Sequence, residues 1–187
     1  MRECLENVRK KQPLIHSITN YVTANDVANV LLACGASPIM ADDVCEAEEI
    51  TAGCAGLNLN LGTPNPRKAE AMKKAGKLSN QLGHIVLLDP VGAGASSFRK
   101  ALSAELLKEI KFDAVRGNIS EIRALALGSG GERGVDAASG EHITEENLSR
   151  MVDFVKQFSR KTGSVIAVTG EIDLVADGDV CYVIRNG

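Results

Sequence analysis

A chain of 187 residues is long enough to bury one α/β domain and too short for two of ordinary size. With 24% charged residues and a formal net charge of −3, it lacks the basic surplus that a general nucleic-acid surface needs. An aromatic content of 3%, with no tryptophan, also disfavours proteins that bind single strands by stacking their bases.

The N-terminus and the cysteines indicate the compartment. Residues 1–12 are charged from the second position onward and contain no apolar signal-peptide core. No apolar stretch reaches the length of a membrane span. The five cysteines form no C-x-x-C pair, and their odd number is typical of reduced thiols. We therefore expect a soluble cytoplasmic protein with neither nucleic-acid nor membrane partners.

Apolar runs that end at turns alternate with amphipathic stretches along the chain. In chain order, the pattern predicts a strand at 14–18, a helix at 23–34, a strand at 37–40, an acidic helix at 44–52, a strand at 56–61 and a helix at 66–82. It then predicts a strand at 85–89, a helix at 98–111, a strand at 114–116, a helix at 120–127, a glycine-rich loop at 128–140 and a helix from the N-cap Thr144 to about Arg160. A strand at 164–169 and a hairpin of 173–176 with 180–184, turning at Asp177-Gly178, complete the series.

This alternation predicts an α/β fold with a mainly parallel sheet and helices on both faces, in a single domain over residues 1–187. The inward stripes are expected to consist of Val27, Val30, Leu31 and Cys34 in the second element, and of Ala69, Met72, Ala75 and Leu78 in the long helix.

Polar groups gather where the expected strands end. Asp42, the stretch 58–63, the stretch 89–95, the stretch 116–121 and the stretch 169–171 each follow a strand. Because ligands of open α/β sheets bind beyond the carboxyl ends of the strands, these groups predict a phosphate- and metal-binding crevice. The standard phosphate motifs are absent: no P-loop is present, and Gly92-Ala93-Gly94 supplies only the first half of a dinucleotide fingerprint and is more typical of a turn.

Two interpretations stay open for the polar residues around the fifth strand. Asn118 and Glu121 lie three positions apart at a helix start, where they could hold a hydrated Mg²⁺ or simply cap the helix. Arg116 could bind a nucleotide phosphate or pair with Glu121. Asp89, just before a proline, could be a second carboxylate on the magnesium or phosphate side or a turn-forming residue.

The remaining candidates favour structural roles. His16 lies inside a strand, which favours a hydrogen-bonded core histidine over a catalytic one. Met40 at a strand end favours core packing, with a pocket wall as the alternative. No cysteine has a base close to it in sequence, so a thiol nucleophile is not expected.

Six blocks of the sequence resemble hydroxyethylthiazole kinases in order and spacing. These are His16–Val22 (HSITNYV), Leu31–Ala41 (LLACGASPIMA), Leu57–Thr63 (LNLNLGT), Leu88–Ala95 (LDPVGAGA), Arg116–Ile122 (RGNISEI) and Val168–Glu171 (VTGE). They extend over essentially the whole chain, which makes the resemblance far more specific than any single motif.

The resemblance implies a ribokinase-like three-layer α/β/α fold and the ATP- and Mg²⁺-dependent phosphorylation of 4-methyl-5-(2-hydroxyethyl)thiazole, in the salvage branch of thiamine biosynthesis. Asn20 and Met40 match thiazole-pocket positions of the family, and Arg116 and Thr169 match ATP contacts. Asp89 and Glu121 match the magnesium and phosphate side. The family pattern further implies a homotrimer with the thiazole site where subunits meet.

The resemblance also implies that part of the kinase lies beyond Gly187. Family members continue past such an Asn-Gly pair into a Gly-Thr-Gly-Cys type loop that opens a helix and surrounds the transferred phosphoryl group. We therefore expect the catalytic residues outside this chain, which would be incomplete for catalysis. Two alternatives remain: a non-catalytic protein that binds thiazole and nucleotide, and a dehydratase of the same fold that repairs hydrated nicotinamide cofactors.

Overall fold

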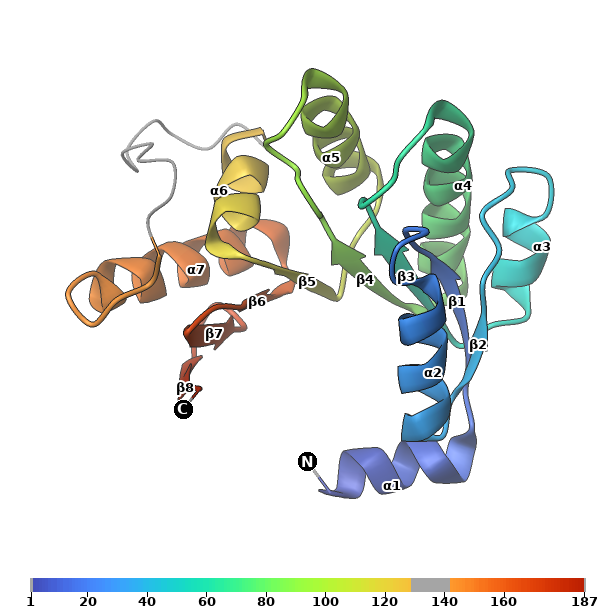
Figure 1. The fold of residues 1–187 in the computed structure, drawn as a ribbon, viewed down its shortest axis with the longest axis horizontal. Helices are drawn as coiled ribbons and strands as arrows, with labels where there is room; N and C mark the ends of the chain where they lie inside the picture. Colours follow the sequence, from blue (N-terminus) through green and yellow to red (C-terminus); the bar gives the residue numbers. More distant parts are fainter. Residues whose placement is uncertain (1, 129–141, 187) are drawn as a thin grey trace. The chain divides into compact units, whose positions relative to one another are not determined.

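Strands and helices alternate along the described residues, 2–128 and 142–186, of this computed structural model (Figure 1). The first half contains α1 (Arg2–Lys11), β1 (Leu14–Ile18), α2 (Ala24–Cys34), β2 (Ser37–Ile39), α3 (Ala47–Ala52), β3 (Gly56–Asn60) and α4 (Pro66–Leu82). The second half contains β4 (Ile85–Asp89), α5 (Ser97–Glu109), β5 (Ala114–Gly117), α6 (Ile119–Gly128), α7 (Leu148–Thr162), β6 (Val165–Val168), β7 (Ile172–Ala176) and β8 (Cys181–Arg185). This order confirms the predicted α/β class.

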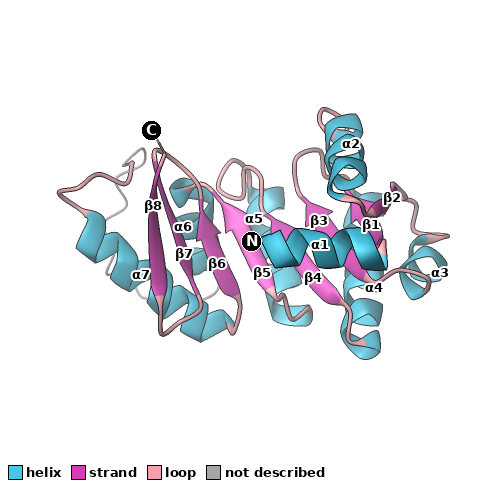
Figure 2. Ribbon diagram, turned by 90° about the horizontal axis from the view of Figure 1, so that it is seen from below, coloured by secondary structure: helices cyan, strands magenta, loops and turns pink. Residues whose placement is uncertain are grey.

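The chain forms two compact units, one up to Val86 and the other from Leu87 onward. In the first unit, β1 pairs in parallel with both β2 and β3. Helix α2 lies on one side of these strands and α4 lies on the other, with α3 packed against α4 (Figures 1 and 2). Three parallel neighbours bring the carboxyl ends of β1, β2 and β3 to one edge, and this edge carries the first group of candidate residues.

Local signals explain why α4 keeps its predicted bounds. Asn65 caps its N-terminus by accepting a hydrogen bond from the Lys68 backbone, and Pro66 occupies the first turn. The helix ends at Gly83, whose φ of 70° is the left-handed conformation that glycine adopts without strain. Its buried side includes Ala69, Met72 and Ala75, as the periodicity predicts.

In the second unit, β4, β5 and β6 run parallel, and β7 and β8 continue the sheet as an antiparallel hairpin. Helices α5, α6 and α7 lie together on one side of these strands (Figure 2). The hairpin turns where predicted, because the Asp177 carboxylate accepts a hydrogen bond from the Val180 backbone at 2.9 Å and Gly178 adopts a φ of 97°.

Four details differ from the sequence predictions, the first of which is helix α1 (Arg2–Lys11), since no helix is predicted before residue 14. Val30, expected in the buried stripe of α2, is 62% exposed. Helix α3 begins at Ala47 instead of 44, since residues 44–46 form a turn. Helix α7 begins after Asn147 and not at Thr144, because the Asn147 side chain accepts a hydrogen bond from the Thr144 backbone and holds residues 145–147 in a turn before the helix. Most of the predicted loop 128–140 lies outside the described residues.

Candidate functional site

Asn20 shapes the loop that follows β1. Its side chain is 7% exposed, and its amide nitrogen donates hydrogen bonds to Thr23 Oγ1 and Asn60 Oδ1, both at 2.9 Å. Its amide oxygen accepts hydrogen bonds from the backbone of Val22 and of Thr23, both at 3.0 Å. Two donors and two acceptor positions are all that an asparagine amide offers. Asn20 therefore fixes the backbone here and has little polar capacity left for a ligand.

Asn60 and Gly62 complete this network from the neighbouring strand. Asn60 Oδ1 also accepts a hydrogen bond from the Gly62 backbone at 2.8 Å. A Cβ at position 62 would lie 2.6 Å from the Asn20 Cβ, a distance that real Cβ atoms essentially never show. Glycine is therefore required at this position. Both residues belong to the stretch 58–63 that the sequence marked only as a polar strand end.

A buried cation lies beside this network and was missed by the sequence reasoning. The Lys68 side chain is 1% exposed, and its Nζ donates to the Thr19 carbonyl and pairs with Asp42 Oδ2, both at 2.9 Å. The same Nζ lies 3.9 Å from the centroid of the Tyr21 ring. Burial of an ammonium group is costly unless it is paired, and these three partners pair it. The available signal was its place on the buried side of α4, at helical spacing from Met72.

Two side chains at this edge are exposed although they are apolar or aromatic. Met40, which follows β2, is 39% exposed, and Tyr21, which follows Asn20, is 68% exposed. The exposure of Met40 is inconsistent with core packing and is compatible with its alternative interpretation as a pocket wall. Because β1 and β2 are parallel neighbours, the segments that carry Tyr21 and Met40 leave the sheet at the same edge.

His16 is the core histidine that the sequence favoured. It is fully buried, and its ring nitrogens contact Thr51 Oγ1 at 2.8 Å and the Ala41 carbonyl at 2.7 Å. A carbonyl can only accept, so Nε2 carries the proton and Nδ1 accepts from the Thr51 hydroxyl. Burial lowers the pKa of His16, although the Ala41 carbonyl opposes this effect. The neutral ring joins β1 to α3 and to the segment after β2.

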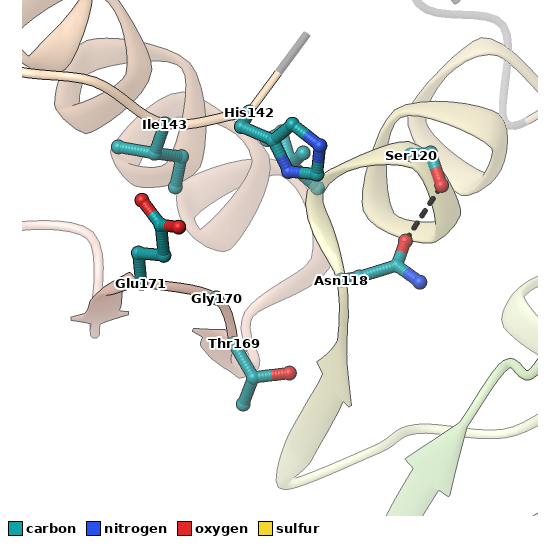
Figure 3. Close-up of a pocket in the computed structure, with 8 residues that line it drawn as sticks. Asn118, Ser120, His142, Ile143, Thr169, Gly170 and Glu171 are labelled. Carbon is teal, nitrogen blue, oxygen red and sulfur yellow. Dashed lines mark hydrogen bonds between the residues drawn. The ribbon is translucent and has the colours of Figure 1, made fainter. Parts of the chain in front are cut away.

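In the second unit, Glu121 connects two strand ends through its carboxylate. Oε1 accepts a hydrogen bond from the Gly92 backbone and Oε2 accepts one from the Asn118 backbone, both at 2.9 Å. Asn118 Oδ1 in turn accepts from the Glu121 backbone at 2.9 Å and from the Ser120 hydroxyl at 2.6 Å (Figure 3). This reciprocal cap at the start of α6 confirms the capping interpretation of Asn118 and Glu121. It leaves each Glu121 oxygen a second lone pair.

Asp89 and Arg116 lie at the ends of the parallel neighbours β4 and β5. Arg116 Nη1 is 3.7 Å from Asp89 Oδ2, so the structure pairs this guanidinium with Asp89 and not with the predicted Glu121. The Asp89 side chain is largely buried, whereas that of Arg116 is half-exposed and can reach a ligand.

Thr169 and Gly170 form the turn after β6, and Asp173 holds this turn. Asp173 Oδ1 accepts a hydrogen bond from the Gly170 backbone at 2.8 Å. The Asn186 amide, the Gly170 backbone and the charge of Arg116 together hold the pKa of Asp173 below its usual value. The sequence analysis did not single out Asp173. The available signal was its position, two residues after the end of the block Val168–Glu171.

A cavity of about 170 Å³ lies between the start of α6 and the end of β6 (Figure 3). It is lined by Asn118, Ile119 and Ser120, by His142 and Ile143, and by Thr169, Gly170 and Glu171. The structure thus brings Thr169 together with the N-terminus of α6, a position where backbone N–H groups favour anions.

In the described part of the chain, no three His, Cys, Asp or Glu side chains gather closely enough to hold a metal ion by themselves. Mg²⁺ commonly takes only one or two protein carboxylates and completes its shell with water and substrate phosphates. Asp89 and Glu121 supply oxygen donors of this kind, so the residues present fit a magnesium ion that a nucleotide brings with it.

Among residues 2–128 and 142–186, no helix is long and apolar enough to cross a membrane.

Comparison with known proteins decides the family. The model of the hydroxyethylthiazole kinase family matches residues 5–187. The hydroxyethylthiazole kinase of Clostridium acetobutylicum is 57% identical over 187 residues, which are 100% of this chain and 68% of that protein. The chain belongs to the hydroxyethylthiazole kinase family.

Solved structures agree with this family assignment. The hydroxyethylthiazole kinase protein of Pyrococcus horikoshii OT3 superimposes with a TM-score of 0.86 at 36% identity, over 99% of this chain and 66% of that one. The adenosine kinase of Sinorhizobium meliloti, at 13% identity and a TM-score of 0.53, shares the fold alone, over 91% of this chain and 57% of that one. These neighbours confirm the ribokinase-like fold class. The chain spans about two thirds of the length of its hydroxyethylthiazole kinase relatives.

Proposed function

We propose that this chain provides the thiazole- and nucleotide-binding part of an ATP-dependent kinase that phosphorylates the hydroxyl group of 4-methyl-5-(2-hydroxyethyl)thiazole in thiamine biosynthesis. The family match over residues 5–187 is the observation that carries the proposal. The edge of the first unit, at Asn20 and Met40, would receive the thiazole. The polar strand ends of the second unit would receive the nucleotide.

In the second unit, Arg116 and Thr169 would contact ATP. Arg116 has a half-exposed guanidinium that can pair with a phosphate, and Thr169 lines the cavity beside the N-terminus of α6. Asp89 and Glu121 would hold Mg²⁺, which neutralises charge on the phosphates during transfer. Asp89 now pairs with Arg116, so binding of metal and nucleotide would give each of these charges a new partner.

In the first unit, Asn20 would act through the backbone, because its amide is occupied within the protein. Met40 would supply an apolar wall for the thiazole ring. The family pattern implies that the residues surrounding the transferred phosphoryl group lie beyond Gly187. Residues 1–187 would then form a single kinase domain together with those residues. Exposed apolar side chains of α2, such as Val30 and Leu32 at 62% and 58%, are compatible with an interface in a homotrimer. The proposed location of this kinase is the cytoplasm.

Calorimetric titration tests the two halves of this proposal separately. Thiazole alcohol alone and MgATP alone should each bind the chain. Met40→Ala should weaken only thiazole binding and Arg116→Ala only nucleotide binding, so each variant is the control for the other. A chain that binds neither ligand would contradict the proposal, and so would binding of a hydrated nicotinamide cofactor in place of thiazole.

Phosphoryl transfer is tested by a coupled assay for ADP release. Turnover is expected only when the loop and helix that the family pattern implies after Gly187 are joined to the chain. Binding of both ligands without turnover in such an extended chain would instead favour the non-catalytic binding protein. Sedimentation analysis of the same extended chain checks the homotrimer.

A further inference from the structure

Tyr21 presents an aromatic ring in an unusual setting. Its side chain is 68% exposed, yet one face of the ring is covered by the buried Lys68 ammonium, whose Nζ lies 3.9 Å from the ring centroid. An exposed tyrosine is usually free to change rotamer. Here a cation–π contact to a side chain that is only 1% exposed restrains the ring.

The Lys68 ammonium group beneath the ring is itself fixed by two partners. Lys68 Nζ donates to the Thr19 carbonyl and pairs with Asp42 Oδ2, both at 2.9 Å. The backbone of Tyr21 is held as well, since its N–H donates to Thr63 Oγ1 at 3.3 Å and the neighbouring Asn20 amide binds the backbone of Val22. The ring is therefore positioned before any ligand arrives, which reduces the entropic cost of binding against it.

The surroundings suit a flat, weakly polar ligand. The Asn20 amide has its hydrogen-bonding positions occupied, so it adds no further polar group for a ligand beside the ring. Val22 is 83% exposed and Met40 is 39% exposed, and both lie in segments that leave the same edge of the sheet. A cation on one face of an aromatic ring withdraws electron density from its other face, which favours stacking with an electron-rich heteroaromatic ring.

We propose that Tyr21, held from beneath by Lys68 and Asp42, is a stacking platform that determines specificity for a heteroaromatic substrate ring. This inference rests on the proposed function, in which the ring is the thiazole. Lys68 is then a positioning residue: it does not touch the substrate and acts by fixing the plane of the Tyr21 ring.

Calorimetry with the thiazole alcohol gives the first test. Tyr21→Leu keeps the bulk of the side chain but removes the ring, and it should weaken binding about tenfold, as loss of a stacked aromatic does in base-binding sites. Tyr21→Phe keeps the ring and should bind within about twofold of the unchanged chain. Tyr182→Phe is the matched control, because Tyr182 is also 68% exposed but lies on β8, and it should leave the affinity unchanged.

Tyrosine emission gives a second test that a purely structural role would not affect. The chain contains two tyrosines and no tryptophan, so Tyr21 is the only strong emitter in the Tyr182→Phe variant. Saturating thiazole alcohol should quench this emission if the rings stack. The quenching should diminish in Tyr182→Phe/Lys68→Met, in which the ring has lost its anchor. This readout does not require Tyr21→Leu to fold.

The outcomes separate this inference from the proposed function. Equal affinity of Tyr21→Leu and the unchanged chain, with no quenching, would overturn the stacking platform and leave the thiazole site intact. A change of sedimenting mass in Tyr21→Leu without a change of affinity would overturn it too, because the ring would then be an interface between copies. No binding of thiazole by the unchanged chain at millimolar concentration would contradict the proposed function itself.

Discussion

Replacing Lys68 by methionine removes the buried charge at the carboxyl ends of β1–β3 and leaves a side chain of similar length. The variant loses a charge-assisted hydrogen bond to the Thr19 carbonyl, which contributes about 1.5–3 kcal/mol, and a cation–π contact that contributes about 0.5–2 kcal/mol. The Asp42 side chain is 38% exposed, so water can solvate its carboxylate once the ammonium is gone. The methionine side chain also stays buried. We therefore expect the free energy of unfolding to fall by about 2–4 kcal/mol.

Urea denaturation followed by far-ultraviolet circular dichroism measures this loss, and Lys74→Met on the same helix is the matched control. The Lys74 side chain is 42% exposed, and its Nζ lies 3.6 Å from Glu48, so its ion pair should contribute less than about 1 kcal/mol. If Lys68→Met and Lys74→Met unfold within about 0.5 kcal/mol of each other, the Lys68 contacts do not stabilise the fold and the reasoning is refuted.

Three further predictions follow from single residues of the two units. Gly62→Ala should cost about 1–3 kcal/mol because its new Cβ meets the Asn20 Cβ, whereas Gly53→Ala, whose Cβ has its nearest neighbour at 3.8 Å, should be neutral or slightly stabilising; equal denaturation midpoints would contradict the steric argument. Glu121→Gln replaces one carboxylate oxygen by an NH₂ group, which cannot accept a hydrogen bond from the Gly92 or Asn118 backbone. The affinity for MgATP should therefore fall at least about tenfold, while the affinity for thiazole is unchanged. Equal losses for both ligands in calorimetry would indicate misfolding instead. Because the pKa of His16 is lowered in the folded chain, the unfolded chain binds a proton near pH 6.5 before the folded chain does. The free energy of unfolding should therefore fall as the pH drops below about 6.5. His16→Gln should show a shallower dependence of the urea midpoint between pH 7.5 and 5, and an equal slope would show that His16 is not the responsible group.

The division of roles at the candidate site has a physical basis. The residues that the family resemblance singled out fall into two kinds in this structure. Met40 and Arg116 have exposed or half-exposed side chains that can contact a ligand. The side-chain oxygens of Asn20 and Glu121 accept hydrogen bonds from backbone N–H groups of the protein. A substitution at either residue therefore changes the loop as well as any contact with a ligand. Their variants should therefore be compared with controls that report folding.

Local sequence signals determined most of the elements of this protein. Leu14–Ile18, Pro66–Leu82 and Ile85–Asp89 have their predicted bounds, because each is a regular apolar pattern that ends at a turn-forming or capping residue. The order of strand and helix also determined the α/β class, since parallel strands need helical crossovers. The same order predicted that the polar groups after the strands gather beyond the carboxyl ends of the sheet.

Only the tertiary structure decided how the polar groups at those edges are used. The Asn20–Asn60 hydrogen bond joins residues 40 positions apart, and the Lys68 bond to Thr19 joins residues 49 positions apart. No local pattern records such pairings, because they depend on how neighbouring strands and helices are brought together in space. For the same reason, helical spacing could place Lys68 on the buried side of α4 but could not show how its charge is paired there, because the partners of the ammonium group are distant in sequence.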